Sequence, residues 1–104
     1  MAISHTNIPH THFHGACRRR EIDELARRCD AAFYMAAIKE PDARDVLSFK
    51  NDIASILEDI AALKILRDEV TCPGCLAEIG WQIPFQTDAL DYLRDTWRSA
   101  GFKV

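Results

Sequence analysis

Apolar residues recur at spacings of three and four through the first two thirds of the chain, which predicts two successive α-helices. The first helix is expected over about residues 17–39, because the residue before Pro41 disfavours helical backbone angles. The second is expected over about residues 41–70. Its near-heptad apolar stripe consists of Val46, Phe49, Ile53, Ile56, Ile60 and Leu63. Both helices carry more apolar surface than one neighbouring helix covers, which indicates additional packing partners.

The last third of the chain has weaker periodicity and several residues that interrupt helices. A short helical turn is expected near residues 75–80, followed by an extended link at Ile83-Pro84. Thr87 is a candidate N-cap for a last helix over residues 88–99, and Gly101 is expected to stop that helix so that Phe102 packs back. The pattern predicts an all-α fold: a small bundle of three main helices, the second one long, plus a short helical turn.

The chain has 104 residues, which is enough for one domain. Residues 1–14 contain Pro9 and all four histidines but almost no apolar pattern, so they are expected to form a flexible N-terminal arm. Residues 15–104 are expected to form a single helical domain. A chain this small buries only a modest share of its surface, and 48% of its residues are apolar. This favours a homodimer that buries the remaining apolar surface between its two chains.

Composition and charge exclude several classes of function. The formal net charge is -3, whereas nucleic-acid binders usually carry a basic surplus, so no direct nucleic-acid partner is expected. Asp52, Glu58 and Asp59 are expected on the exposed side of the long second helix, where they would repel phosphates. The longest apolar run, residues 31–38, is far shorter than the roughly 20 residues that cross a bilayer. With no signal-peptide pattern at the N-terminus, we expect a cytoplasmic protein that does not engage a membrane and keeps its cysteines reduced.

The run C-P-G-C at residues 72–75 is the strongest chemical pattern in the sequence. Two cysteines at this spacing can form half a zinc site, but a second cysteine pair is absent. A position after a helix C-terminus would raise a thiol pKa, and without strands a redox active site is disfavoured. The favoured interpretation is a proline-glycine turn with no metal and no cofactor. A zinc site completed by Cys17 or His14 remains the alternative.

Catalytic patterns are also absent: there is no phosphate-binding glycine loop, nucleophile elbow or metalloprotease motif, so the protein is not expected to be an enzyme. The apolar surplus instead points to protein–protein contact. The dimer is expected on the long helix, and the outer face of the first helix is expected to bind a partner. The predicted interface residues are Phe33, Tyr34, Met35, Ile38, Leu47, Phe49, Ile53, Ile56 and Ile60.

The segments RRCDAAFYMAAIKEPDARDVLSFKNDIASILEDIAALKILRDEV and CPGCLAEIGWQIPF resemble the small quorum-sensing antiactivators of pseudomonads. This resemblance implies a helical dimer that binds the ligand-binding domain of a LasR-type transcriptional activator. Such a protein would cover the surface through which the activator dimerises, so that the activator no longer holds its DNA. Three alternatives are a small zinc-stabilised module, a DNA-binding regulatory module and an anti-defence inhibitor protein.

Overall fold

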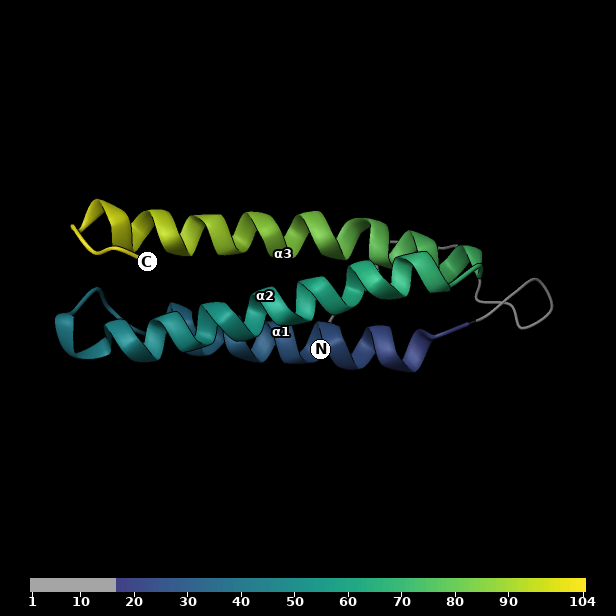
Figure 1. Ribbon diagram of the computed structural model, residues 1–104, viewed down its shortest axis with the longest axis horizontal. Helices are drawn as coiled ribbons and strands as arrows, with labels where there is room; N and C mark the ends of the chain where they lie inside the picture. The colour runs from purple at the N-terminus through teal and green to yellow at the C-terminus, as the bar shows by residue number, and fades with distance from the viewer. Residues whose placement is uncertain (1–16) are drawn as a thin grey trace.

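The computed structural model describes residues 17–104, which form three long helices packed side by side (Figure 1). They are α1 (Arg19–Ala37), α2 (Val46–Glu69) and α3 (Pro73–Ser99), with a short 3-10 turn η1 (Ala43–Asp45) before α2. No strand occurs in this range, so the all-α prediction is confirmed. The predicted arm, residues 1–14, lies outside the described residues. Within the described part of the chain, no helix has the length and apolar character needed to span a bilayer.

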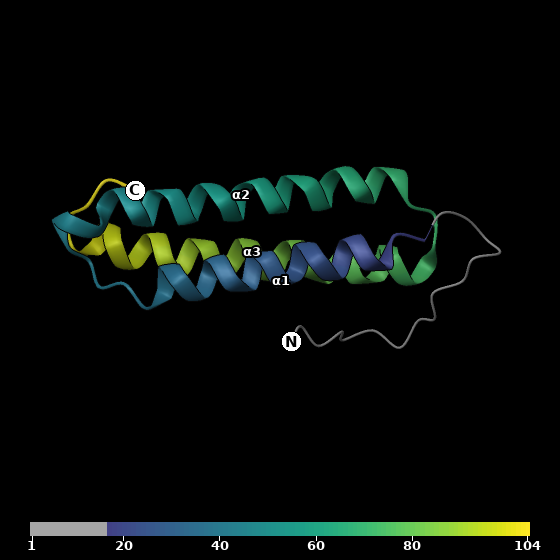
Figure 2. The ribbon, with the colours of Figure 1, turned by 90° about the horizontal axis from the view of Figure 1, so that it is seen from below.

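The helices run up, down and up along a body of 52 × 21 × 18 Å. The chain reverses direction twice, so α1 and α3 run parallel while α2 runs antiparallel to both (Figures 1 and 2). This topology places the first residues of α1 and the first residues of α3 at the same end of the bundle. Side chains that are more than 50 positions apart in sequence therefore meet there.

The first two helices lie close to their predicted ranges, and the segment around Pro41 separates them as expected. The second α-helix begins later than predicted, because residues 43–45 form the tighter 3-10 turn. The carboxylate of Asp42 caps this turn by accepting a hydrogen bond from the backbone N–H of Arg44 at 2.8 Å. A local cap thus starts the 3-10 turn that precedes α2.

The prediction of two separate C-terminal helical pieces is wrong, because α3 continues from Pro73 to Ser99 with Pro84 inside it. Neither the extended link at Pro84 nor the N-cap at Thr87 occurs. Thr87 lies within the helix and its hydroxyl donates to the Ile83 carbonyl at 2.7 Å. The buried face continues on both sides of the proline at helical spacing, through Ile79, Gln82, Gln86, Leu90, Leu93 and Trp97. Tertiary packing therefore outweighs the local preference of proline.

The core consists of two apolar clusters, one toward each end of the bundle, and Ile83 packs against both. The cluster at the end where α1 and α3 begin contains Ile22, Leu63, Leu66, Val70, Cys72, Cys75 and Ile79. The other contains Cys29, Ala36, Phe49, Ile53, Ile56, Ile60, Leu90, Leu93 and Trp97. In this second cluster the Phe49 and Trp97 rings stack with their centroids 4.1 Å apart.

The C-terminus closes the second cluster as the sequence predicted. Gly101 has a φ of 94°, which side chains rarely tolerate, and it ends the helical path after α3. The backbone N–H of Phe102 donates to the Trp97 carbonyl at 3.1 Å, and the Phe102 ring meets the Trp97 ring edge-on at 5.5 Å. The last residues thus cover the core at this end.

One charged residue departs from its predicted place. Asp59 was expected to be solvated, but its side chain is buried in α2 at 5% exposure. Burial raises its pKa, while the Arg28 guanidinium at 3.5 Å opposes that shift. Asp52 is ion-paired with Lys39, which joins the end of α1 to α2. The polar side of α2 therefore contributes to helix packing as well as to solubility.

Candidate functional site

The nine predicted interface residues divide into two groups in the structure. Four of them, Phe49, Ile53, Ile56 and Ile60, are buried in the core of the single chain. Phe33 is half-buried, and the remaining four, Tyr34, Met35, Ile38 and Leu47, are exposed. The surface that is available to another protein therefore lies on the outer face of α1 and at the start of α2.

An apolar groove of about 330 Å³ lies between the parallel helices α1 and α3. Its lining residues are Asp30, Phe33, Tyr34, Ala37, Phe85, Gln86 and Ala89. The two polar members are tied to each other, because the Gln86 amide donates to Asp30 Oδ1 at 3.2 Å. The same amide nitrogen lies 3.3 Å from Gln82 Oε1. The groove therefore combines apolar walls with a hydrogen-bonded polar pair.

Two exposed aromatic side chains line this groove, and a third lies on the same side of α3. Tyr34 is 64% exposed and Phe85 is 52% exposed, and both line the groove. Tyr92, at 71% exposure, lies seven residues after Phe85, so it is on the same side of α3 two turns further on. Trp81 meets Phe85 edge-on at 5.5 Å, which holds the phenylalanine ring at the rim. Exposed aromatic groups in one place are typical of a protein-binding surface.

Reasoning from the sequence missed Tyr92 and did not place Phe85 on a helix. Because a break was expected at Pro84, Phe85 was not assigned to a helix. Its seven-residue spacing to Tyr92 therefore did not indicate a shared helix face. With the helix continuous, that spacing is the signal that identifies this side of α3.

A second exposed apolar feature runs along the outside of α2. Its members, Leu47, Ala54, Ala61 and Ile65, lie within about 40° of one another around the helix axis and all are exposed. Small alanines between two large aliphatic residues permit close approach of another helix. We refer to these four residues as the α2 stripe.

A third concave region, of about 370 Å³ between α1 and α2, is lined largely by charged side chains. The Arg18 guanidinium there bonds to Glu21 at 2.5 Å and approaches Glu69 at 3.4 Å. These contacts raise the pKa of Arg18, and Arg18 lowers the pKa of Glu21. Because these charges pair with one another, this region is a weaker candidate than the groove for capturing an outside group.

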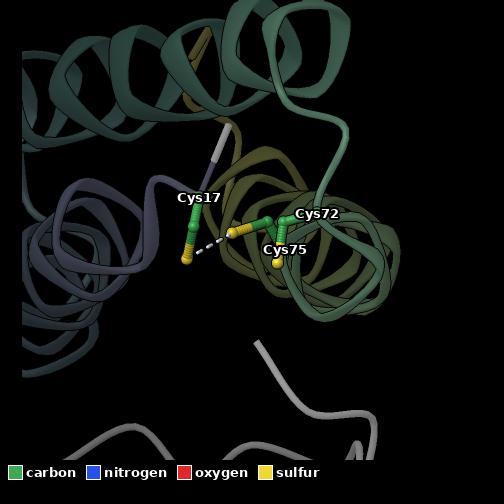
Figure 3. Close-up of side chains that lie close together, drawn as sticks. All are labelled: Cys17, Cys72 and Cys75. Carbon is green, nitrogen blue, oxygen red and sulfur yellow. Dashed lines mark hydrogen bonds between the residues drawn. The ribbon is translucent and has the colours of Figure 1, made fainter. Parts of the chain in front are cut away.

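The structure brings three cysteines together at the end where α1 and α3 begin (Figure 3). Cys17 precedes α1, Cys72 is the N-cap residue of α3, and Cys75 lies in the first turn of α3. Their three sulfur atoms lie within 4.8 Å of one another. The Cys75 and Cys17 sulfurs are 3.7 Å apart, and the backbone N–H of Arg18 donates to the Cys75 sulfur at 3.3 Å. We call these three residues the thiol cluster.

The location of the thiol cluster corrects the sequence interpretation of the C-P-G-C run. The run was expected to follow a helix C-terminus and act as a turn, but it begins α3, with Pro73 in the first helical turn, where proline is favoured. The thiols therefore face the partial positive charge of a helix N-terminus. Burial nevertheless raises the pKa of Cys75 to about 12, partly opposed by the Arg18 N–H.

Comparisons of the sequence and fold with protein-family models, curated proteins and solved structures found no match. The class that the structure defines is a three-helix, all-α chain whose described residues present an apolar groove, the α2 stripe and a thiol cluster. The groove is suited to binding and the thiol cluster to metal chemistry.

Proposed function

We propose that the protein is a protein-binding regulator that holds an apolar helix of its partner in the groove between α1 and α3. The observation that carries this proposal is that Tyr34 and Phe85, both more than half exposed, line one apolar groove. The exposed Tyr92 lies on the same side of α3 as Phe85. Aromatic side chains of this kind supply most of the binding energy in protein interfaces. An amphipathic helix lying in an apolar groove is a recurrent mode of recognition between proteins.

The dimensions of the surface suit a short helix. From Asp30 to Ala37 the α1 rim is eight residues long, which corresponds to about 12 Å, or roughly two helical turns. The hydrogen-bonded pair Asp30 and Gln86 offers polar contact at one end of this span. Met35 and Ile38 extend the apolar surface beyond Tyr34 on the outer side of α1. A partner helix would therefore bury two turns of apolar side chains.

In its specific form, the proposal is an antiactivator that binds the ligand-binding domain of a LasR-type transcriptional activator. Occupying the surface through which that activator dimerises would keep it from holding its DNA. This mechanism needs an apolar helical surface and no catalytic group, which is consistent with the side chains that line the groove. The sequence resemblance to small quorum-sensing antiactivators supports the choice of partner.

The proposal includes a homodimer that pairs through the α2 stripe, leaving the α1–α3 groove of each chain open. Light scattering coupled to size exclusion is expected to give twice the 11.8 kDa mass of one chain. Ile65 is an exposed apolar residue of the stripe. Ile65→Asp is expected to shift the protein toward the monomer mass, because the dimer would then bury an unpaired carboxylate. Leu76→Asp on α3 is the matched control and should leave the mass unchanged. A wild-type mass of one chain would contradict the dimer.

The groove is tested with Tyr34→Asp and Phe85→Asp, each measured for affinity to a purified LasR-type ligand-binding domain. Each variant is expected to weaken binding about 30-fold or more, because removal of a central aromatic contact costs about 2 kcal/mol or more. Both side chains are exposed, so helicity measured by circular dichroism should stay at the wild-type level. The wild-type protein is also expected to reduce the activator's dimer mass and its DNA binding.

Leu76→Asp again serves as the matched control, because Leu76 is an exposed apolar residue of α3 that lies on the opposite side from Phe85. It should bind like the wild type. Wild-type binding by both groove variants would remove the groove from the mechanism. If the wild-type protein fails to bind the activator domain at all, the antiactivator proposal is wrong.

A further inference from the structure

The thiol cluster has no role in the proposed protein–protein contact, yet three of the chain's four cysteines meet in it. Cys72 and Cys75 are fully buried, and Cys17 reaches them from a segment more than 50 positions earlier in the chain. We propose that Cys17, Cys72 and Cys75 bind one zinc ion as thiolates and thereby join the start of α1 to the start of α3.

The sulfur spacing is that of a zinc site. With zinc–sulfur bonds of about 2.3 Å and tetrahedral angles, two thiolates on one ion lie about 3.8 Å apart. The Cys17 and Cys75 sulfurs are 3.7 Å apart, and no pair in the cluster exceeds 4.8 Å. Adjustments of about 1 Å in side-chain position would therefore complete the geometry. A disulfide needs about 2.05 Å between two sulfurs and would leave the third cysteine unused.

The surroundings favour thiolates once a cation is present. The N-terminal ends of α1 and α3 lie at this end of the bundle, and their partial positive charges stabilise anionic sulfur (Figures 1 and 3). The Arg18 N–H that donates to the Cys75 sulfur is an outer-shell hydrogen bond of the kind that orients metal ligands. Each thiol that binds gives up its proton to solvent as its sulfur bonds to zinc. Soft thiolate ligands and a C-x-x-C spacing favour zinc over magnesium or calcium.

Among residues 17–104, the three cysteines are the only group of potential ligands that converges in this way, and all four histidines of the chain precede Cys17. Three protein thiolates leave the fourth position of a tetrahedral zinc ion to water or to another ligand.

Zinc at this position would act as a structural staple. Along the chain, α1 and α3 are connected only through α2, so the metal would add a coordinate-bond link between the starts of the two helices that form the groove. Because the ligands meet only in the folded chain, the free energy of metal binding adds to the free energy of folding. A chain of 104 residues gains proportionally more from such a link than a large domain does.

The test uses the full chain, prepared without a polyhistidine tag, reduced with a non-thiol reductant and stripped with a chelator. Titration with zinc against a chromophoric chelator is expected to show one zinc per chain. Cobalt is expected to give the visible absorption of tetrahedral cobalt together with thiolate-to-metal charge transfer. Zinc is also expected to raise the melting temperature in proportion to the logarithm of its concentration.

Cys17→Ser, Cys72→Ser and Cys75→Ser are each expected to weaken zinc binding by more than about 100-fold, beyond the range seen for loss of an outer-shell contact. Cys17 precedes α1 and is half-exposed, so its variant keeps the fold even if a variant in α3 does not. Cys29→Ala is the matched control, because Cys29 is buried in the other core cluster, and it should bind zinc like the wild type.

Two results would overturn the site: wild-type protein that binds no zinc in competition with the chelator, or Cys17→Ser protein that binds as tightly as the wild type. This test is independent of the proposed partner, since it needs only the protein and the metal.

Discussion

Replacing Trp97 with alanine is expected to lower the free energy of unfolding by about 3–5 kcal/mol. The Trp97 side chain is 1% exposed, stacks on Phe49 of α2 and meets the edge of Phe102. Its removal leaves a cavity where α2, α3 and the C-terminal residues converge, and the surrounding helices can close such a space only in part. Urea unfolding followed by far-UV circular dichroism measures the change. At about 4 °C or more per kcal/mol for a domain near this size, the melting temperature should fall by more than about 10 °C.

Tyr92→Ala is the matched control for this prediction, because Tyr92 is an aromatic residue of the same helix that lies largely in solvent. Its replacement is expected to change stability by about 0.5 kcal/mol or less. Equal stability of the two variants would mean that Trp97 does not hold α2 and α3 together. Tyr92→Ala also removes an aromatic group beside the groove, so the two variants separate loss of folding from loss of binding.

The core stripe of α2 could be predicted from the sequence because it depends on local spacing alone. Phe49, Ile53, Ile56 and Ile60 are three or four residues apart, and the structure buries all four on one side of the helix. The end of α3 was predictable for the same reason, since Gly101 is a local stop signal. Features that depend on one or two turns of a helix can thus be predicted from the sequence.

The groove and the thiol cluster depend on contacts between distant segments. The sequence could therefore name Cys17 as a candidate partner of Cys72 and Cys75, but it could not show that they meet, and it did not place the groove. The approach of Cys17 to Cys75 follows from α1 and α3 running parallel, which no local pattern encodes. The groove required Phe85 to lie on a helix that continues through Pro84. The local penalty of one proline was smaller than the stabilisation from the buried face on both sides of it.

The proposed zinc site and the proposed groove share the same pair of helices. Zinc would fix α1 to α3 at the Cys75 end, while the hydrogen bond from Gln86 to Asp30 joins them further along, at the edge of the groove. A metal-free protein is therefore expected to have a less rigid groove. Rigid binding surfaces lose less conformational entropy when a partner binds, so metal and partner binding would support each other.

Replacing Pro84 with alanine is expected to stabilise the protein by about 2 kcal/mol. A proline inside a helix lacks the N–H that would bond to the carbonyl four residues earlier, here Gly80, and its ring crowds that carbonyl, at a cost of about 3 kcal/mol. Alanine restores the bond and has the highest helix propensity. Part of the gain is lost, because proline also restricts the unfolded chain by about 0.4–1 kcal/mol. Urea unfolding measures the difference in the free energy of unfolding.

Pro73→Ala provides a control with the same chemical change and the opposite expectation. Pro73 lies in the first turn of α3, where a missing N–H costs nothing and a fixed φ favours the helix start, so its replacement should be neutral or destabilising. Both variants are compared in the presence of chelator, because Pro73 stands between Cys72 and Cys75. If α3 were broken into two pieces at Pro84, alanine there would gain no helical hydrogen bond, and the two variants would behave alike. If Pro84→Ala is stabilised and Pro73→Ala is not, α3 is one continuous helix. This continuity is what places Phe85 at the groove.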